Sequence, residues 1–280
     1  MISLGFGDMM KDYRKKHNLT QTELAQMMGI SKNHYSVLER GEKIPRAKTI
    51  EAFQRLVSED EVVRCMTNTE MSSSQRKEYA ALFTCLDGMG PKKRAQVMDA
   101  IIGLCLEESS KDPVEILEKM MSMDFCHMHG PEHHVMVGAA LLTAYKNAGG
   151  DIELNSALTE MMSRGKSVPG GACGFWGACG AGISSGMFVS IISGSTPLEN
   201  EPFALSHKMT ARSLQAIGDI GGPRCCKRDS YLSILEAIDF VKENFGVEME
   251  RHEITCTRSS ENNQCIGKRC PFSKMNRYRG

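Results

Sequence analysis

The stretch TQTELAQMMGISKNHYSVLERG, residues 20–41, carries the signals that start and stop two short helices. Thr20 and Glu23 have the spacing of a capping box, in which each side chain accepts a hydrogen bond from the other residue's backbone N–H. Gly29 suits the left-handed position that ends a helix, and Ser31 suits the cap that begins the next one. Two short helices joined by a tight turn, with a polar and basic face on the second, follow the helix-turn-helix plan.

Apolar residues within and around this stretch recur at helical spacing, so we expect them to form one small core. They are Met10, Tyr13, Leu19, Leu24, Met28, Ile30, Tyr35 and Leu38. Between Lys11 and Lys48, nine lysines and arginines stand against four acidic residues, although the 34 basic and 34 acidic residues of the whole chain balance. This regional excess of positive charge favours DNA as a partner of the N-terminal part.

Residues 9–57 resemble the phage-repressor (Cro-type) helix-turn-helix family along their whole length. The matching features are LTQTELA, the glycine turn, the pattern S-x-x-x-Y-S-x-L-E-R-G and a P-x-x-x-T start of a further helix, all in order. The resemblance implies a five-helix-type DNA-binding domain over residues 1–66. It also implies a homodimer on double-stranded DNA, since one such helix reads only half of a site.

The same resemblance assigns the residues that contact DNA. The family's backbone-clamping glutamine falls on Gln21, and Lys43 and Arg46 are expected to contact phosphates. The base-reading positions fall on Lys32, Asn33, His34, Ser36 and Val37. Lysine suits the acceptors of guanine, and asparagine can pair bidentately with adenine. Val37 stands where a polar residue is frequent, so it is expected to meet a thymine methyl group or no base.

A polar stretch, TNTEMSSS at 67–74, predicts a linker. Residues 75–123 then predict a helical hairpin connector, with helices over 75–89, 91–108 and 113–123. Pro91 and Pro113 sit where prolines of a first helical turn belong, with Gly90 and Asp112 before them as caps. The amphipathic hairpin suits a dimer interface or a spacer between domains, and the sequence does not choose between them.

From residue 124 to 280 we expect a separate, mostly helical domain that is rich in cysteine and glycine. Eight of the eleven cysteines and six of the eight histidines lie there. No signal peptide or transmembrane run is expected, which places the chain in the cytoplasm and away from membranes. In that reducing compartment, cysteines are expected to bind metal, react or pack, and not to form disulfides.

Two motifs open the list of candidate ligands in this domain. The first, CHMHGPEHH at 126–134, brings Cys126, His129 and His133 together at a spacing that suits a metal. The second is the glycine-rich loop GGACGFWGACGAG at 170–182, which carries Cys173 and Cys179. Because Cys179 precedes a small-residue helix whose positive end lowers a thiol pKa, the loop suits either a metal or cluster ligand or a cysteine nucleophile.

The remaining candidates lie in GGPRCCKR at 221–228 and in the basic tail. Cys225 and Cys226 are too close to form an unstrained disulfide with each other. The tail supplies Cys256, Cys265 and Cys270. We expect one or both of the adjacent thiols to share a buried site with the loop and part of the tail, holding an iron–sulfur cluster or zinc. The first motif completes that site or forms a second one.

Residues 126–271 resemble an uncharacterised cysteine- and histidine-rich domain of bacteria and archaea. The matching pieces are HGPEHH, NAGG, VPGGACGFWGACGAG, STPL, GGPRCCKR and the closing C…N-x-x-C…CP. This domain family implies a shared site but no activity. The sequence therefore predicts a mainly α transcription regulator whose C-terminal domain carries or senses a metal, a cluster or a small ligand. The alternative is a metal- or cysteine-dependent enzyme, in sulfur or one-carbon chemistry, fused to a DNA-binding domain.

Overall fold

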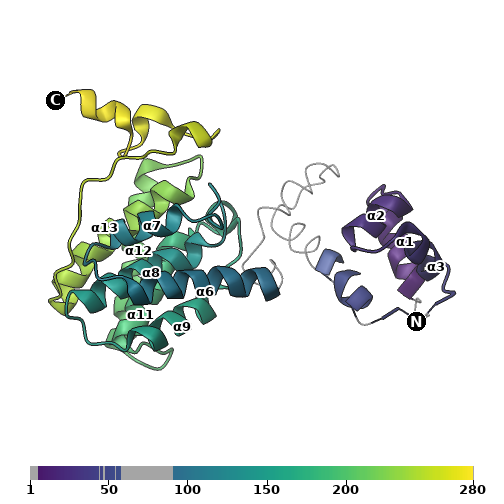
Figure 1. Cartoon of the computed structure of the whole chain (residues 1–280), viewed down its shortest axis with the longest axis horizontal. Coiled ribbons are helices and arrows are strands. Elements are labelled where there is room, and N and C mark those ends of the chain that lie inside the picture. Colours follow the sequence, from purple (N-terminus) through teal and green to yellow (C-terminus); the bar gives the residue numbers. More distant parts are fainter. Residues whose placement is uncertain (1–5, 44, 47, 54, 58–90, 280) are drawn as a thin grey trace. The chain divides into compact units, whose positions relative to one another are not determined.

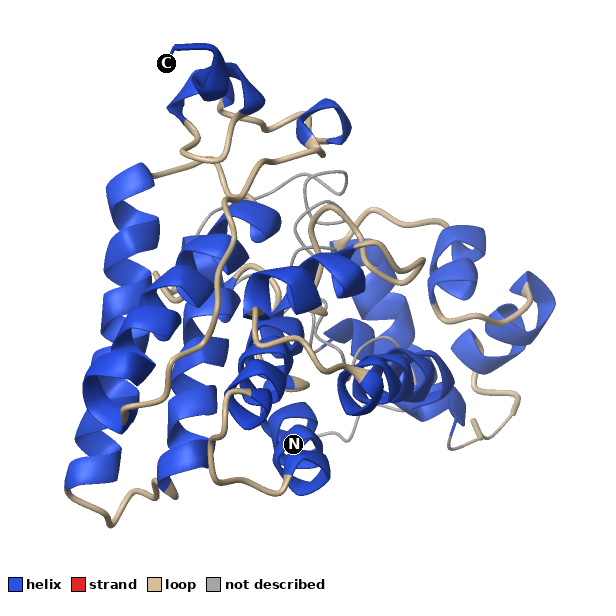
Figure 2. Ribbon diagram, turned by 60° about the vertical axis from the view of Figure 1, so that its left-hand side comes forward, coloured by secondary structure: helices blue, strands red, loops and turns tan. Residues whose placement is uncertain are grey.

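The chain forms two compact units, Met1–Phe83 and Thr84–Gly280 (Figure 1). The computed structural model describes residues 6–43, 45–46, 48–53, 55–57 and 91–279. Every regular element of these residues is a helix, apart from one isolated bridge between Cys256 and Ser273 (Figure 2). The prediction of a mainly α protein is confirmed. The predicted linker at 67–74 and the predicted helix at 75–89 lie outside the described residues.

The first unit is built on the caps that its sequence contains. Its helices are α1 (Phe6–Lys16), α2 (Gln21–Met27) and α3 (Lys32–Glu39), and residues 48–53 and 55–57 are also helical. Thr20 and Glu23 form the capping box at the start of α2, and the Ser31 side chain accepts a hydrogen bond from the backbone of His34 at the start of α3. Gly29 and Gly41 adopt left-handed conformations, with φ of 66° and 72°. Met10, Leu24, Tyr35 and Leu38 are buried in the predicted core.

The second unit contains the remaining helices. They are α6 (Pro91–Glu107), α7 (Pro113–Met121), α8 (His133–Asn147), α9 (Leu154–Gly165), α10 (Ala172–Phe175), α11 (Gly180–Ser193), α12 (Glu201–Ile220) and α13 (Cys226–Phe245). Three short 3₁₀ turns follow, η2 (Ser259–Glu261), η3 (Gly267–Arg269) and η4 (Lys274–Arg279). Figure 1 shows these turns at one end of the helical bundle.

Helix α8 is the centre of the second unit and is buried on nearly every side. It contacts α6, α7, α9, α11 and α13. A helix that is apolar all round in this way belongs in the middle of a core. Gly138 lets α11 approach closely, because a Cβ at this position would collide with the Met161 side chain and lie 3.1 Å from the Ser184 carbonyl oxygen.

The segment expected as a connector contributes to this same core. Val97 and Ile101 from α6, and Ile116 and Leu117 from α7, are buried within it. Asp112 caps α7 as predicted, since its carboxylate accepts the backbone N–H of Val114 at 2.8 Å. Residues 91–123 thus pack as part of the second unit.

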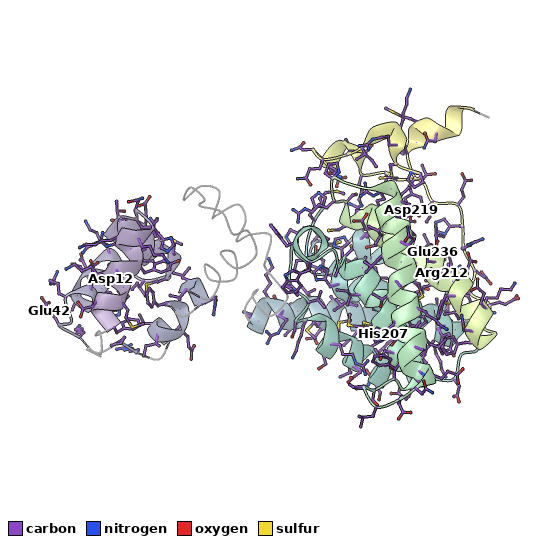
Figure 3. The ribbon with its side chains drawn as sticks, turned by 180° about the vertical axis from the view of Figure 1, so that it is seen from behind. Asp12, Glu42, His207, Arg212, Asp219 and Glu236 are labelled. Atoms are coloured by element: carbon purple, nitrogen blue, oxygen red, sulfur yellow. The ribbon has the colours of Figure 1, made fainter. Side chains whose placement is uncertain are left out.

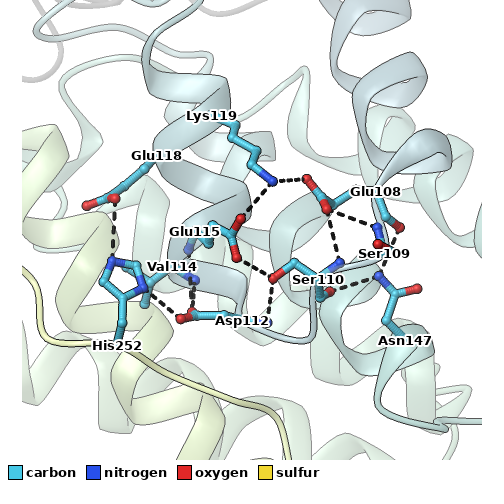
Figure 4. Close-up of polar contacts among 10 residues, drawn as sticks. All are labelled: Glu108, Ser109, Ser110, Asp112, Val114, Glu115, Glu118, Lys119, Asn147 and His252. Carbon is cyan, nitrogen blue, oxygen red and sulfur yellow. Dashed lines mark hydrogen bonds and ion pairs between the residues drawn. The ribbon is translucent and has the colours of Figure 1, made fainter.

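The start of α7 also holds the chain that leaves α13 (Figure 4). His252 Nδ1 lies 2.7 Å from the second oxygen of Asp112, and its Nε2 lies 3.5 Å from a Glu118 carboxylate oxygen. Burial lowers the pKa of His252, but the two carboxylates outweigh burial and leave the pKa raised. These two contacts fasten the segment before the tail to α7.

Ion pairs also join helices on the surface of the second unit. Arg212 on α12 contacts Glu236 at 2.6 Å and Glu243 at 2.7 Å, both on α13 (Figure 3). Such exposed pairs contribute little to stability, so the buried apolar contacts carry the packing of these helices. Among the described helices, none combines the length and the apolar composition that crossing a membrane requires.

Candidate functional sites

Helix α3 exposes two of the five predicted base-reading residues fully to solvent. Lys32 and Asn33 are exposed, while His34, Ser36 and Val37 are half-buried. Lys43 and Arg46, the predicted phosphate contacts, are exposed beyond the end of this helix. Arg40 donates a hydrogen bond of 2.6 Å to the Ser36 hydroxyl. The arrangement leaves two long polar side chains at the start of α3 free to reach base edges in a groove.

Gln21 donates a hydrogen bond to the ion pair that joins Arg14 of α1 to Glu39, the last residue of α3. Arg14 donates two hydrogen bonds to the Glu39 carboxylate, at 2.7 and 3.2 Å, and Gln21 Nε2 donates a third at 3.2 Å. Burial raises the pKa of Glu39, but the hydrogen bonds from Arg14, Tyr35 and Gln21 and the charge of Arg14 together outweigh burial and leave the pKa lowered. The carboxylate therefore fixes both α1 and the start of α2 against α3.

Four thiols line a single cavity in the second unit. Cys225, Cys256, Cys265 and Cys270, here called the tail cluster, surround a space of about 20 Å³. Backbone N–H groups point at three of these sulfurs. Gly267 N donates to Cys265 Sγ at 3.4 Å. Burial raises the pKa values of Cys225 and Cys270, and the N–H groups of Arg228 and Phe272 oppose this rise only in part. Amide donors aimed at sulfur stabilise thiolates.

Basic side chains surround the tail cluster. Arg228 and Arg258 line the same cavity, and Arg228 is buried with its Nε 3.0 Å from Asp229. A buried cation needs nearby negative charge. Asp229 supplies one such charge, and thiolates in the cavity would supply more.

The two adjacent cysteines point to different places because α13 begins between them. Cys225 is the cap of the helix and faces the tail cluster, whereas Cys226 is its first residue. Cys226 lies with Cys173 and Cys179, close enough for the three thiols, here called the loop cluster, to affect one another's pKa.

Burial raises the pKa values of all three thiols of the loop cluster. Burial raises the pKa of Cys226 to about 12, and burial and then Asp229 also raise the pKa of Cys179. The Cys179 thiol lies 3.9 Å from an Asp229 carboxylate oxygen, to which it can donate. Cys179 does cap α11, as expected, but burial outweighs the helix end, so the expected lowering of its pKa is wrong. A raised thiol pKa is unfavourable for a cysteine nucleophile, because the thiolate is the reactive form.

The first motif forms a third group beside α13. Cys126 Sγ, a Glu132 carboxylate oxygen and a His133 ring nitrogen all lie within 4.8 Å of one another. We call these three residues the histidine group. Lys227 is buried and donates a hydrogen bond of 2.8 Å to Cys126 Sγ.

The predicted ligand His129 lies outside this group. Its Nε2 is 3.3 Å from the Asn262 side-chain oxygen, and the Asn262 amide donates to Cys225 Sγ at 3.5 Å. His129 therefore contacts the tail cluster through a bridging side chain.

The structure thus divides the ten predicted ligands among three groups and one bridging histidine. Sequence reasoning missed Glu132 and Asp229, both of which are buried. A signal was available, since charged residues directly beside cysteines and histidines in apolar surroundings require partners. All nine cysteines of the described part have free thiols.

Comparisons with known proteins divide the chain in the same way. A family model described as "Family of unknown function (DUF5714)" matches residues 101–273, and a helix-turn-helix model matches residues 10–56. The chain is also similar to the ImmF control region 10 kDa protein of Bacillus phage phi105. The two are 35% identical over 75 residues, which make up 27% of this chain and 83% of the phage protein. No solved structure matches the chain.

Proposed function

We propose that this chain, which belongs to the family of unknown function DUF5714 and carries a Cro-type helix-turn-helix domain, is a sequence-specific transcription regulator. Its C-terminal domain carries a metal centre that sets its affinity for DNA. That it is a DNA-binding regulator follows from the helix-turn-helix match and from the similar phage control protein. The specific contacts, the metal and the homodimer are the proposed part.

For DNA, the proposal is that α3 enters the major groove with Lys32 and Asn33 at base edges. Both side chains are exposed at the start of the helix, where recognition helices contact bases. Gln21, held by Glu39, clamps the backbone, and Lys43 and Arg46 contact phosphates beyond α3. A homodimer places two such helices on the two halves of a near-palindromic site.

Asn33→Ala is expected to cost about 1–3 kcal/mol of binding free energy at one base pair and to relax the preference there, because it removes a bidentate base contact. Lys43→Ala is the matched comparison. It should weaken all sequences alike and reduce the slope of log affinity against log salt by about one, since it removes one phosphate contact. Fluorescence anisotropy with an operator selected from random DNA measures both. If Asn33→Ala lowered the affinity for the operator and for random DNA equally, the assignment of Asn33 as a base-reading residue would be contradicted.

For the metal, the single observation that carries the proposal is the tail cluster, in which four cysteines line one cavity. Four thiolates are the ligand set of structural zinc and of iron–sulfur clusters. The N–H groups aimed at three of the sulfurs and the two arginines at the cavity offset the negative charge that four thiolates bring. These are the features that a tetrathiolate site needs and that packed, inert cysteines do not need.

The size of the cavity bears on which metal it would hold. A space of about 20 Å³ has room for about one water-sized sphere. A single zinc or iron ion needs less room than a four-iron cube, but binding it requires the four sulfurs to move together, since among the described residues no three of them lie within 4.8 Å of one another. We therefore favour one tetrathiolate ion and treat an iron–sulfur cluster as the second outcome of the test.

The test is DNA binding with and without the metal. Protein prepared without oxygen is analysed for zinc, iron and sulfide and by its visible spectrum, then stripped with a chelator and reloaded. We expect metal-loaded and metal-free protein to differ in operator affinity by about 5–150-fold, the usual range of coupling between two sites. By the same linkage, operator DNA should change metal affinity by an equal factor. Equal operator affinities would show that the metal does not regulate, and absence of bound metal would overturn the proposal itself.

A further inference from the structure

The histidine group has the geometry of a second metal site, separate from the tail cluster. Cys126 Sγ and His133 Nε2 face each other at 3.9 Å, and a Glu132 oxygen completes the triangle. Glu132 is 0% exposed and His133 is 1% exposed. Thiolate, imidazole and carboxylate are the three ligand types that zinc and iron(II) accept in proteins.

The orientation of His133 suits a ligand. Its Nδ1 lies 3.0 Å from the Gly130 carbonyl oxygen, which can only accept, so Nδ1 carries the hydrogen. Nε2 then presents its lone pair toward Cys126. Metal-binding histidines are usually fixed in this manner, by a hydrogen bond from the other ring nitrogen to a carbonyl or carboxylate.

Glu132 supplies the observation that requires a ligand. Its Oε1 accepts the backbone N–H of His127 at 2.8 Å, but its buried Oε2 has no hydrogen-bond partner among the described residues. Leaving a buried carboxylate oxygen unpaired is costly. The backbone also makes room for this carboxylate, because a Cβ at Gly130 would collide with it.

Lys227 suggests what else the site binds. Its buried ammonium donates to Cys126 Sγ at 2.8 Å. A thiolate and a carboxylate neutralise a divalent cation, so the charge of Lys227 remains available to an anion. Three protein ligands also leave the fourth position of a tetrahedral ion open, which distinguishes catalytic and ligand-binding zinc sites from structural ones.

We propose that Cys126, Glu132 and His133 bind one zinc or iron(II) ion with an open fourth position, and that Lys227 holds an anionic ligand there. Cys126 gives up its proton when the metal binds. This site goes beyond the proposed function, since it requires neither the tail cluster nor DNA.

The test counts metal ions per chain with matched variants of the full-length protein. Each protein is stripped anaerobically, incubated with excess Co²⁺, desalted and analysed for bound cobalt. Glu132→Gln keeps the shape and the hydrogen bond from His127 but removes the anionic ligand. His133→Asn keeps a donor for the Gly130 carbonyl but lacks Nε2. Both should hold one cobalt ion fewer than the wild type.

His134→Asn is the control, because His134 is the next residue on α8, is also buried and has its Nδ1 3.0 Å from the Val168 carbonyl oxygen. It should keep the wild-type count. Equal counts in all proteins, or an equal loss in His134→Asn, would overturn the proposal. Circular dichroism checks folding. If either variant unfolds, Cys126→Ser in the Cys265→Ser background should retain the fold and show a weaker sulfur-to-cobalt absorption band than Cys265→Ser alone.

Failure of this site and failure of the tail cluster give different results. Cys265→Ser alters the tail cluster only. The difference in bound cobalt between Cys265→Ser and the Cys265→Ser/Glu132→Gln double variant therefore reports the histidine group alone. A difference of one ion supports the site whatever the tail cluster holds, and no difference contradicts it. Adding small carboxylate or thiolate anions to the cobalt-loaded protein should change its spectrum, and Lys227→Met should weaken that response at least tenfold.

Discussion

The double substitution Cys265→Ser and Cys270→Ser is expected to strip the metal from the tail cluster and to release the tail, residues 256–279, from the second unit. Structural zinc contributes about 10–16 kcal/mol of apparent binding energy in small peptides, which is comparable with the stability of a whole domain. Residues 247–255 are held to the second unit by His252 and by buried Met249 and Ile254. The regular structure of residues 256–279 is limited to 3₁₀ turns and one isolated bridge, with Phe272 as a buried apolar side chain.

The helices from α6 to α13 are expected to remain folded in this variant, because their core is built around α8 and does not depend on the tail. Hydrogen exchange should therefore show fast exchange over residues 256–279 and protection before them, together with the loss of bound metal. Cys105→Ser is the control, since Cys105 is also buried but its thiol only lies 3.9 Å from the Ala139 carbonyl oxygen. An unchanged metal content in the double variant, or a tail that stays protected, would refute the tail cluster as a metal site.

Arg14→Ala is expected to lower the free energy of unfolding of the first unit by about 3–5 kcal/mol, the usual cost of removing one partner from a buried ion pair. The Glu39 side chain is 5% exposed and that of Arg14 is 19% exposed, so the remaining carboxylate would be left without its main partner. Because Gln21 donates to the same carboxylate, operator binding should fall as well.

The matched control is Arg40→Ala, because Arg40 pairs with Glu42 at the surface, where both side chains are more than half exposed. It should cost no more than about 1 kcal/mol. Far-UV circular dichroism in urea follows both units, while the single tryptophan, Trp176, reports the second unit by fluorescence. A transition that shifts in dichroism but not in fluorescence locates the effect in the first unit. Equal effects of Arg14→Ala and Arg40→Ala would contradict the role given to the buried pair.

The first unit was predictable because its signals are local. Thr20, Glu23 and Ser31 cap helices within three residues of their own position, and Gly29 and Gly41 end helices through their own backbone angles. A capping hydrogen bond or a left-handed glycine depends on neighbours in the chain, so spacing alone reveals it. The same holds for Asp112 before Pro113 and for Cys179 at the start of α11.

The sites of the second unit were predictable only as a set of residue types. The cysteines and histidines could be named from the sequence, but their division into groups depends on packing between distant segments. Cys225 meets Cys256, Cys265 and Cys270 only because the tail returns across the start of α13. Helix α13 begins at Cys226, so two adjacent thiols enter different clusters, and no periodicity in the sequence could show which.

The sequence by itself therefore determined the mainly helical fold, the Cro-type domain and the identity of the candidate ligands, since each rests on local spacing or on composition. Only the tertiary structure decided which thiols share a cavity, that Glu132 joins Cys126 and His133, and that the cation of Lys227 lies against a sulfur 101 residues away in the chain. The physical reason is that a site built from side chains on separate helices exists only after those helices have packed. The same packing buries Cys179 and raises its pKa. From the sequence alone, the start of α11 was expected to lower that pKa.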